Sequence, residues 1–326
     1  MNPFSCLTYQ TDLSFTSSNS SFSDCLRYHS SSHIYSSHIN SIDCDPDCEG
    51  RDLASQQFFL DDSPTHTFTS CAWTGCSAVL GGAISFQEQT SSSLFVSRCI
   101  FYSCKSTSPE WETGGGAIHC NNVNFVSIIS SSFLSCTCEG GGGGGINFCN
   151  IQNQPSLSEC DIISCSASAD GGGISIFYSY ANVDQLICNN CRFLSCCISN
   201  NLESEYIFSG GGIILWQNHN ILICSDILFT SNTGTCGGGY ATSQSTVLQT
   251  CFLCFCFFNR NTGSCGTDAY FDPLPSDAFQ HCFSTSDSHR IGYYSSGYQK
   301  TDENWLLQKT INEMFTKRHT ITKLAH

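Results

Sequence analysis

The sequence predicts an all-β fold, a single-stranded parallel β-helix of about seven to nine coils. Three observations support this prediction. A glycine marker recurs at intervals of about thirty residues, a second marker alternates with it, and the segments between them are short and strand-like. Such a period is typical of a stacked repeat rather than of a conventional globular domain.

The first marker is a glycine run followed by an apolar residue. The length of each repeat is measured from one of these apolar residues to the next, and we call this series the ruler. Its positions are Ile84, Ile118, Ile146, Ile174, Ile213, Tyr240 and Tyr270. Glycine reaches positive φ without a Cβ clash, so we expect the glycines at sharp corners of each coil. The following apolar residue is expected to point into the core and to stack on its counterparts.

The second marker is an aromatic residue or Ile followed three residues later by Cys or Asn. It occurs at Phe68…Cys71, Phe101…Cys104, Phe133…Cys136, Ile162…Cys165, Phe193…Cys196, Phe229…Asn232 and Phe258…Asn261. We expect the terminal Cys or Asn to stack from coil to coil. Stacked Asn forms a hydrogen-bonded ladder, whereas Cys in the same place behaves as a small buried apolar residue.

The segments that carry these markers have the composition of short strands. Residues 173–177, 213–216 and 221–224 are runs of Ile, Leu, Phe and other strand formers, and Gly, Asn, Ser and Asp fill the intervals. Helical repeats would instead need apolar stripes at a spacing of 3.6. A β-propeller is the structural alternative, although unequal steps and single-strand segments suit its blades poorly.

The paired markers resemble the polymorphic outer-membrane protein repeat, which combines a GGAI-type motif with a later FxxN-type motif. Residues 81–84 and 115–118 match the first motif literally, and residues 229–232 and 258–261 match the second. The other copies carry Cys in place of Asn. The resemblance covers about residues 65–275 and implies a right-handed parallel β-helix exposed at a cell surface, as in bacterial autotransporter adhesins. It implies no catalytic residues.

The repeats divide the chain into three parts. Residues 1–60 are Ser-rich and are predicted to form an N-terminal cap or degenerate coils, because open β-helix ends expose strand edges. Residues 61–298 hold the β-helix repeats. Residues 299–326 form a basic tail with a predicted short helix, whose apolar face would comprise Trp305, Leu306, Ile311, Met314 and Phe315.

The composition limits the classes of partner. Charged residues make up 12% of the chain, against about 25% in typical proteins, and the formal net charge is −15. This balance disfavours nucleic acid, since phosphate binding needs clustered Lys and Arg. Residues 1–10 show no secretory signal, and no apolar stretch of about 18 residues predicts a transmembrane segment. The cell-surface or extracellular location that the resemblance implies therefore stays open.

The 25 cysteines are an odd number, so they do not all pair within one chain. One spacing recurs, with four residues between partners, at Cys71/Cys76, Cys99/Cys104, Cys160/Cys165 and Cys191/Cys196. Equivalent cysteines on adjacent coils are expected about 5 Å apart, but with Cβ atoms aimed the same way, which suits a disulfide poorly. We expect most to be buried core thiols, with some disulfides as the alternative if the protein is secreted.

Four other motifs are assigned to structure rather than to chemistry. The histidines at 29, 33 and 38 and the cysteines at 44 and 48 have spacings seen in zinc sites, but their Ser-rich context favours a polar surface segment. Residues 251–256 lack the second cysteine pair of a metal site. Residues 43–47 begin like a calcium loop, yet Cys48 stands where that loop needs Gly. Residues 140–145 lack the Lys-Ser/Thr of a phosphate loop. No cofactor and no metal site are predicted.

Two steps of the ruler are longer than the rest, from Ile84 to Ile118 and from Ile174 to Ile213. Extra residues in a coil leave the stack as loops, here near residues 106–113 and 198–209. Acidic and aromatic residues in such loops are candidate binding residues, and the alternative is neutral surface drift. The candidates are Glu110, Trp111, Glu112, Glu203, Glu205 and Tyr206.

The leading hypothesis is a non-enzymatic, adhesin-like surface or secreted protein that binds a host-cell or matrix protein or a glycan through these loops. One alternative is a carbohydrate-active enzyme, a polysaccharide lyase or hydrolase, by analogy with other β-helices. Its acidic candidates, Asp161 and Asp226, are expected two coils apart. The other alternative is a truncated or degenerate copy without independent function.

Overall fold

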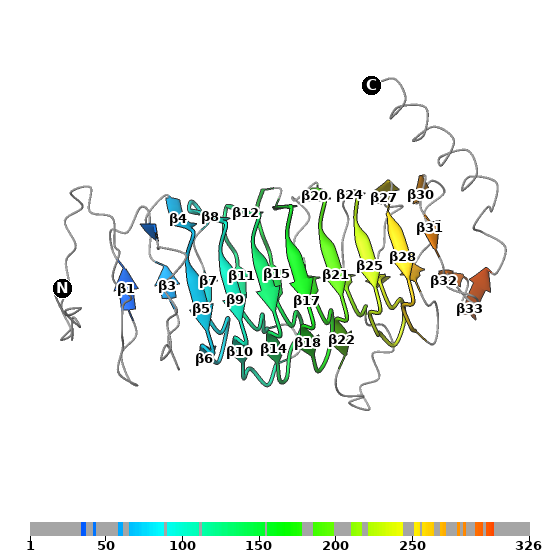
Figure 1. Ribbon diagram of the computed structural model, residues 1–326, viewed down its shortest axis with the longest axis horizontal. Coiled ribbons are helices and arrows are strands. Elements are labelled where there is room, and N and C mark those ends of the chain that lie inside the picture. Colours follow the sequence, from blue (N-terminus) through cyan, green and yellow to red (C-terminus); the bar gives the residue numbers. More distant parts are fainter. Residues whose placement is uncertain are drawn as a thin grey trace, which may run out of the picture.

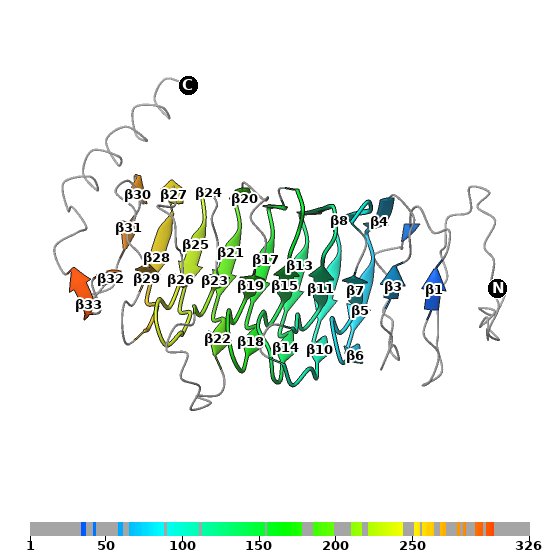
Figure 2. The same ribbon diagram turned by 180° about the vertical axis from the view of Figure 1, so that it is seen from behind.

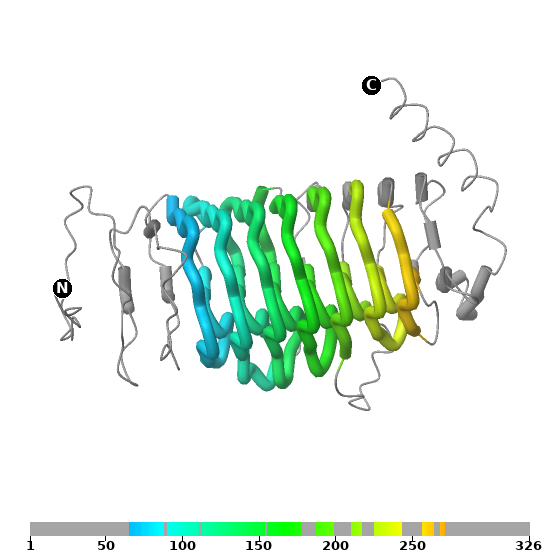
Figure 3. The backbone as a smooth tube through the Cα atoms, viewed as in Figure 1, coloured from blue at the N-terminus to red at the C-terminus, as the bar shows by residue number. Residues whose placement is uncertain are grey.

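The computed structural model describes most of residues 65–270, with gaps at 88–89, 111–112, 154, 178–184, 199–209, 217–220, 244–250, 255 and 264–267. Strands outside this range, and a few inside it, are given by their backbone alone. The described residues contain strands and turns and no helix. The strands lie side by side in a stack of coils (Figure 1), and the smooth trace in Figure 3 follows the chain from coil to coil.

Each coil contributes one strand to each of up to four sheets, which we number in the order in which a coil visits them. Sheet 1 has nine strands: β2 (Ile42–Asp43), β4 (Thr65–Thr69), β8 (Ser93–Ser97), β12 (Phe125–Ile129), β16 (Ser156–Ser158), β20 (Gln185–Asn189), β24 (Ile221–Ser225), β27 (Cys251–Cys254) and β30 (Phe279–Gln280). Sheet 2 has eight strands: β5 (Ala72–Thr74), β9 (Ile100–Tyr102), β13 (Ser132–Leu134), β17 (Asp161–Ile163), β21 (Arg192–Leu194), β25 (Leu228–Thr230), β28 (Phe257–Asn259) and β31 (Phe283–Ser284).

Sheet 3 has five two-residue strands: β6 (Ser77–Ala78), β10 (Lys105–Ser106), β14 (Thr137–Cys138), β18 (Ser166–Ala167) and β22 (Cys197–Ile198). Sheet 4 has eleven strands: β1 (Ile34–Ser36), β3 (Phe58–Leu60), β7 (Ile84–Gln87), β11 (Ile118–Asn121), β15 (Ile146–Cys149), β19 (Ile174–Phe177), β23 (Ile213–Trp216), β26 (Tyr240–Ser243), β29 (Ala269–Phe271), β32 (Ile291–Ser295) and β33 (Tyr298–Asp302). Figure 2 shows sheet 4 from its own side.

The predicted all-β parallel solenoid is confirmed. Five consecutive coils, from β4–β7 to β20–β23, carry a strand in all four sheets. The strand pairs are parallel except β32 with β33, which run antiparallel where the sequence places the start of the C-terminal tail. The predicted helix in that tail, like the predicted cap over residues 1–60, lies outside the described residues. The count of seven to nine coils stays a prediction.

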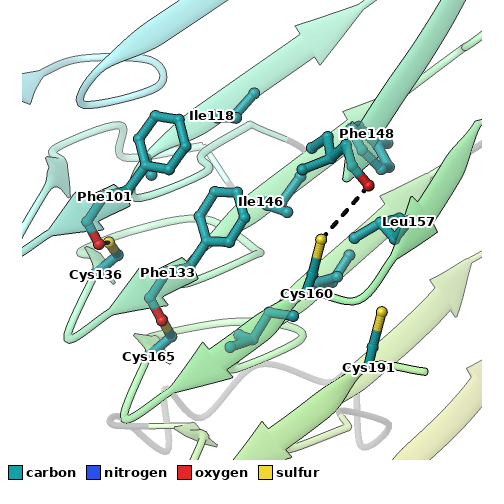
Figure 4. Packing of buried hydrophobic residues seen from close by; sticks show 14 of the residues in the cluster. Phe101, Ile118, Phe133, Cys136, Ile146, Phe148, Leu157, Cys160, Cys165 and Cys191 are labelled. Atoms are coloured by element: carbon teal, nitrogen blue, oxygen red, sulfur yellow. Dashed lines mark hydrogen bonds between the residues drawn. The ribbon is translucent and has the colours of Figure 1, made fainter. Parts of the chain in front are cut away.

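The core is a set of side-chain ladders that run along the stack. In sheet 2 the middle residue of each three-residue strand points inward, and Trp73, Phe101 and Phe133 stack face to face at centroid distances of 4.6 and 4.7 Å. Phe193 and Phe229 repeat the arrangement at 5.1 Å. Figure 4 shows two of these rings beside the isoleucines that follow the glycine marker. In-register parallel pairing therefore converts a sequence repeat into continuous apolar columns.

The register corrects the first copy of the second marker. Trp73 pairs with Phe101 in sheet 2, whereas Phe68 pairs with Val96 in sheet 1. The copy that begins the marker ladder is thus Trp73…Cys76. The pair Phe68…Cys71 belongs to a second ladder with the same spacing, so the spacing alone does not separate the two.

The register also corrects the last copy of the glycine ruler. Tyr240 pairs with Ala269, and Ala241 pairs with Tyr270. Ala269 therefore points into the core, and Tyr270 lies on the opposite face of sheet 4 within a separate apolar cluster. The assignment of Tyr270 to the core was wrong because the bulkier of the two residues was expected inside.

The glycines have the role expected of them. Gly81, Gly115 and Gly143 have φ values of 57°, 70° and 73° at the corner that precedes sheet 4. The next glycine in each copy is required for a different reason, since a Cβ at Gly82 would lie 2.3 Å from the carbonyl oxygen of Gly116 in the following coil. The first glycine thus sets the turn and the second allows adjacent coils to approach.

Candidate interaction surfaces

The two predicted loops belong to the same connection of their coils. Both interrupt the connection from sheet 3 to sheet 4, between β10 and β11 and between β22 and β23. This connection spans residues 79–83, 139–145 and 168–173 in the other complete coils, but 107–117 and 199–212 in the two long ones. Three coil spacings separate β10 from β22, the strands after which the two insertions begin, which corresponds to about 14 Å along the stack.

The first loop is closed by hydrogen bonds between its own residues. Ser108 is buried, and its hydroxyl contacts that of Thr113 and accepts a hydrogen bond of 3.3 Å from the Glu110 amide. The Glu110 carbonyl accepts hydrogen bonds from the Thr113 amide at 3.2 Å and from the Thr113 hydroxyl at 3.0 Å. Glu110 itself is exposed. The loop is therefore a tight turn that holds this glutamate in solvent.

The neighbouring coil has a glycine run because its backbone packs closely against the backbone of this loop. A Cβ on Gly140 would lie 2.2 Å from the Ser108 carbonyl oxygen, and one on Gly141 would lie 1.5 Å from the Thr113 carbonyl oxygen. The long run at 140–145 thus serves two purposes, the corner of its own coil and a contact surface for the loop beside it. Of the predicted binding residues the structure places Glu110; Trp111, Glu112, Glu203, Glu205 and Tyr206 lie outside the described residues.

The outer face of sheet 4 is covered by the turns of the protein itself. Ser85, His119, Asn147 and Ser175 occupy successive strands on this face and are at most 3% exposed. Gly142 lies against Ser175, since a Cβ there would approach the Ser175 hydroxyl to 2.7 Å. The connections from sheet 3 thus fold over the sheet and bury a polar row.

The polar row is joined by side-chain hydrogen bonds. His119 Nδ1 lies 3.1 Å from Asn147 Oδ1, and the Cys149 thiol donates to the same oxygen at 3.0 Å. Burial lowers the pKa of His119 from 6.5 to about 4, so the ring is neutral near pH 7. A buried, neutral and hydrogen-bonded imidazole fits a structural role better than proton transfer with a substrate.

Asp170 is the buried carboxyl group of the same region. It precedes Gly171 at the corner before β19, and its backbone carbonyl accepts a hydrogen bond of 2.7 Å from the Gly143 amide. Burial raises the pKa of its side chain from 3.8 to about 8. At neutral pH the group is therefore largely protonated, which removes the cost of a buried charge.

Two cysteine ladders flank sheet 2, and they explain the recurrent cysteine spacing. Cys71 and Cys76 lie at the two ends of β5, just as Cys99 and Cys104 lie at the two ends of β9. Sixteen described cysteines are thiols, nearly all of them buried, as predicted. Burial raises the pKa of Cys165, so this thiol is protonated and unreactive at neutral pH.

The thiols at the corner that follows each sheet 2 strand make the hydrogen bonds that asparagine makes in later coils. The Cys136 thiol donates to the Phe101 carbonyl at 3.4 Å, and the Cys165 thiol donates to the Phe133 carbonyl at 3.4 Å. Asn232 Nδ2 donates to the Phe193 carbonyl at 2.9 Å. Cysteine therefore replaces asparagine as a donor, which extends its expected role as a small buried apolar residue.

The outer face of sheet 2 is uncovered within the described residues and is unusually apolar. Each three-residue strand presents its first and third side chains outward, so two rows run along the stack. Ile100, Tyr102 and Phe257 are 43%, 48% and 38% exposed. Both faces of parallel sheets are normally covered, so an open apolar face marks an interaction surface. The outward residues are Ala72, Thr74, Ile100, Tyr102, Ser132, Leu134, Asp161, Ile163, Arg192, Leu194, Leu228, Thr230, Phe257 and Asn259.

One ion pair lies in the middle of this face. Arg192 Nε donates to Asp161 Oδ1 at 2.5 Å, and the Arg192 Nη2 group pairs with the second carboxylate oxygen. The Asp161 carboxylate raises the pKa of the guanidinium. Asp226, the other acidic candidate for carbohydrate chemistry, precedes β25, two coils from the strand of Asp161. The expected separation of these two carboxylates is confirmed.

This open face was not predicted, although the sequence carries a signal for it. Strands with one buried face should alternate apolar and polar residues. Here Ile100-Phe101-Tyr102 and Phe193-Leu194 are apolar on both faces, which indicates that the outward side also meets an apolar surface.

No family model matches the chain, and the comparisons with curated proteins and with solved structures gave no match either. In the part of the chain that the structure describes, no helix is both long enough and apolar enough to cross a membrane.

Proposed function

We propose that this protein is a non-enzymatic, adhesin-like binding protein at a cell surface or in the extracellular space. It binds a host-cell or matrix protein or a glycan through the loops between sheets 3 and 4. The proposal takes its surface location, and a right-handed β-helix of seven to nine coils with a short C-terminal helix, from the resemblance to the polymorphic outer-membrane protein repeat.

The observation that carries the proposal is the common position of the two insertions. Both lengthen the same connection, and the intervening coils keep it short. The strands that flank the two insertions lie three coils apart, about 14 Å along the stack, which suits a single ligand that contacts both loops. The hydrogen-bonded turn around Glu110 fixes the backbone of this residue, which lowers the entropic cost of binding.

A binding assay with the full chain tests the proposal. The probes are cultured epithelial cells, immobilised collagen, fibronectin and laminin, and a glycan array. One variant combines Glu110→Lys, Trp111→Ala and Glu112→Lys, and a second combines Glu203→Lys, Glu205→Lys and Tyr206→Ala. We expect each to reduce binding by at least about tenfold, since a few central residues carry most binding energy.

The matched control is Glu159→Lys, which reverses an exposed acidic residue at the corner between sheets 1 and 2. It makes the same type of charge change outside the loops. Binding that falls in the loop variants and persists in the control supports the proposal. Equal binding by all four proteins, or equal loss in the control, contradicts it.

A further inference from the structure

The outer face of sheet 2 has the pattern of a self-complementary surface. It consists of a central ion pair, apolar side chains on both sides of it along the stack, and serines along one rim. The rim residues Ser103, Ser135, Ser164, Ser195 and Ser231 are exposed at the corner that follows each strand. An apolar centre inside a polar rim is the usual anatomy of a protein interface.

We propose that this face binds a second copy of the same chain. The two copies pack face to face about a twofold axis that lies in the interface, runs along the strand direction and passes between β17 and β21. This dimer is independent of the loops and of the ligand proposed for them.

The charges select this register. The axis places Asp161 of one copy opposite Arg192 of the other, and the reciprocal pair forms by symmetry. Within each copy the two residues already form an ion pair on adjacent strands. Four charges of alternating sign therefore meet at the centre, and each keeps an opposite neighbour when water is excluded.

The apolar residues agree with the same register. Counting outward from the axis, β9 of one copy faces β28 of the other, so Ile100 opposes Phe257. These are among the most exposed large apolar side chains of the described residues. At the centre Ile163 opposes Leu194. Asp226, on the rim beside β25, opposes Ser130 rather than another acidic residue, so no like charges are brought together.

The other in-plane twofold axis fits poorly. An axis along the stack would place each strand opposite itself and exchange the two outward rows. Asp161 would then face Ile163, and Arg192 would face Leu194. Both charges would lose water without gaining a partner across the interface, which is costly. Shifting the first axis by one coil also separates Asp161 from the opposite Arg192.

The area of this face determines the affinity that we expect for the dimer. Seven described strands at about 4.8 Å and five residues at about 3.3 Å per strand give roughly 550 Å² of flat area per copy. This lies below the ~800 Å² per partner of a standard stable interface. We therefore expect a concentration-dependent dimer with a dissociation constant on the order of micromolar.

A charge-exchange experiment tests the register. Sedimentation velocity over about 1–200 µM would compare the full-length protein with Asp161→Arg and Arg192→Asp. Each single variant gives four like charges at the centre, so we expect self-association to weaken at least tenfold. Mixing the two single variants pairs opposite charges across the interface again. We expect the mixture to recover association to within about threefold of the unaltered protein.

Two further variants keep the test decisive. The double variant Asp161→Arg/Arg192→Asp retains the ion pair within each copy, so it should fold and dimerise like the unaltered protein. Ile129→Ser removes an apolar side chain that is 43% exposed on sheet 1, and it should leave association unchanged. A monomeric unaltered protein at all concentrations overturns the proposal. A mixture that associates no better than its components also overturns it.

Discussion

At the scale of single residues, the interior hydrogen bonds decide which substitutions a coil tolerates. Cys196 occupies the last cysteine position before the ladder changes to asparagine. Its thiol donates to the Ile162 carbonyl at 3.3 Å, and its amide donates to Asn232 Oδ1 at 2.9 Å. Asn232 in turn has its amide and its side chain bonded to Asn261 Oδ1, at 3.0 and 3.1 Å. The two residue types thus share one bonding scheme.

Cys196→Asn should therefore extend the asparagine ladder by one coil at little cost. We expect its free energy of unfolding to stay within about 1 kcal/mol of the unaltered protein. Cys196→Ala loses the thiol donor and leaves a small cavity, and should cost about 1–2 kcal/mol more. Urea denaturation measures both. An alanine variant as stable as the asparagine variant would show that the donor is unimportant.

Asp170 and His119 make opposite contributions to the pH dependence of stability. The pKa of Asp170 is raised in the folded state, so the native protein binds more protons and loses stability as pH rises from about 4 to 8. The pKa of His119 is lowered, so stability rises as pH increases from about 4 to 6.5. The two effects oppose each other below pH 6.5, and only that of Asp170 persists above it.

We expect the unaltered protein to lose up to about 1.4 kcal/mol per pH unit between pH 6.5 and 8, and Asp170→Asn to abolish this loss. Urea midpoints at four pH values in that interval measure the slope. His119→Gln is the control, because it changes the dependence only below pH 6.5. The same slope in Asp170→Asn and in the unaltered protein would contradict the assignment.

At the scale of elements, the corners show what a local pattern reveals and what it leaves out. The glycine corner before sheet 4 was predictable, because a glycine run that recurs in every repeat indicates a backbone turn with positive φ. The two corners that flank sheet 2 were not, because most of their left-handed residues are not glycine. Ser135 and Ser164 have φ values of 53°, and Glu159 has 56°. Serine is common in ordinary turns, so nothing local marked these positions.

Two glycines with contrasting surroundings test this distinction. Gly75 has a φ of 66° with no atom within 4 Å of a Cβ, and it occupies the corner where the next five coils have serine. Gly75→Ser should cost about 1–2 kcal/mol, the ordinary cost of a non-glycine residue in the left-handed region. Gly141→Ser should cost more than about 2 kcal/mol, because its side chain would collide with the loop backbone at Thr113. Thermal or urea unfolding compares them, and equal effects would show that the loop moves aside freely.

At the scale of the whole molecule, the sequence predicted the solenoid because a one-dimensional repeat encodes it many times over. A single marker is weak evidence for a fold, but two markers that alternate in phase are compatible with few folds. The errors arose at the first and last copies, where two residues fit the same pattern. Phe68 and Trp73 both precede a cysteine by three residues, and Ala269 and Tyr270 both follow the final glycine. Only the pairing between coils distinguishes them.

The candidate surfaces were predictable to different degrees for a related reason. The loops change the spacing of the repeat, so they were visible in the sequence. The outer face of sheet 2 is open because no described connection folds back over it. The outer face of sheet 4 is covered because turns from neighbouring coils fold over it. The buried Ser85 and His119 and the exposed Tyr102 all occupy outward positions of their strands. Their surroundings come from other coils, and no local pattern specifies them.

The ladder of corner hydrogen bonds gives the rod a direction. The Cys196 thiol bonds back to the carbonyl of Ile162 in the preceding coil, and the Cys196 amide bonds forward to the side-chain oxygen of Asn232 in the next. A newly formed coil thus presents a donor toward the C-terminal end, and the next coil supplies its acceptor. Synthesis from N- to C-terminus adds coils in the same order, so each new turn of chain meets a prepared surface. We therefore expect the coils to add to the stack in the order of synthesis.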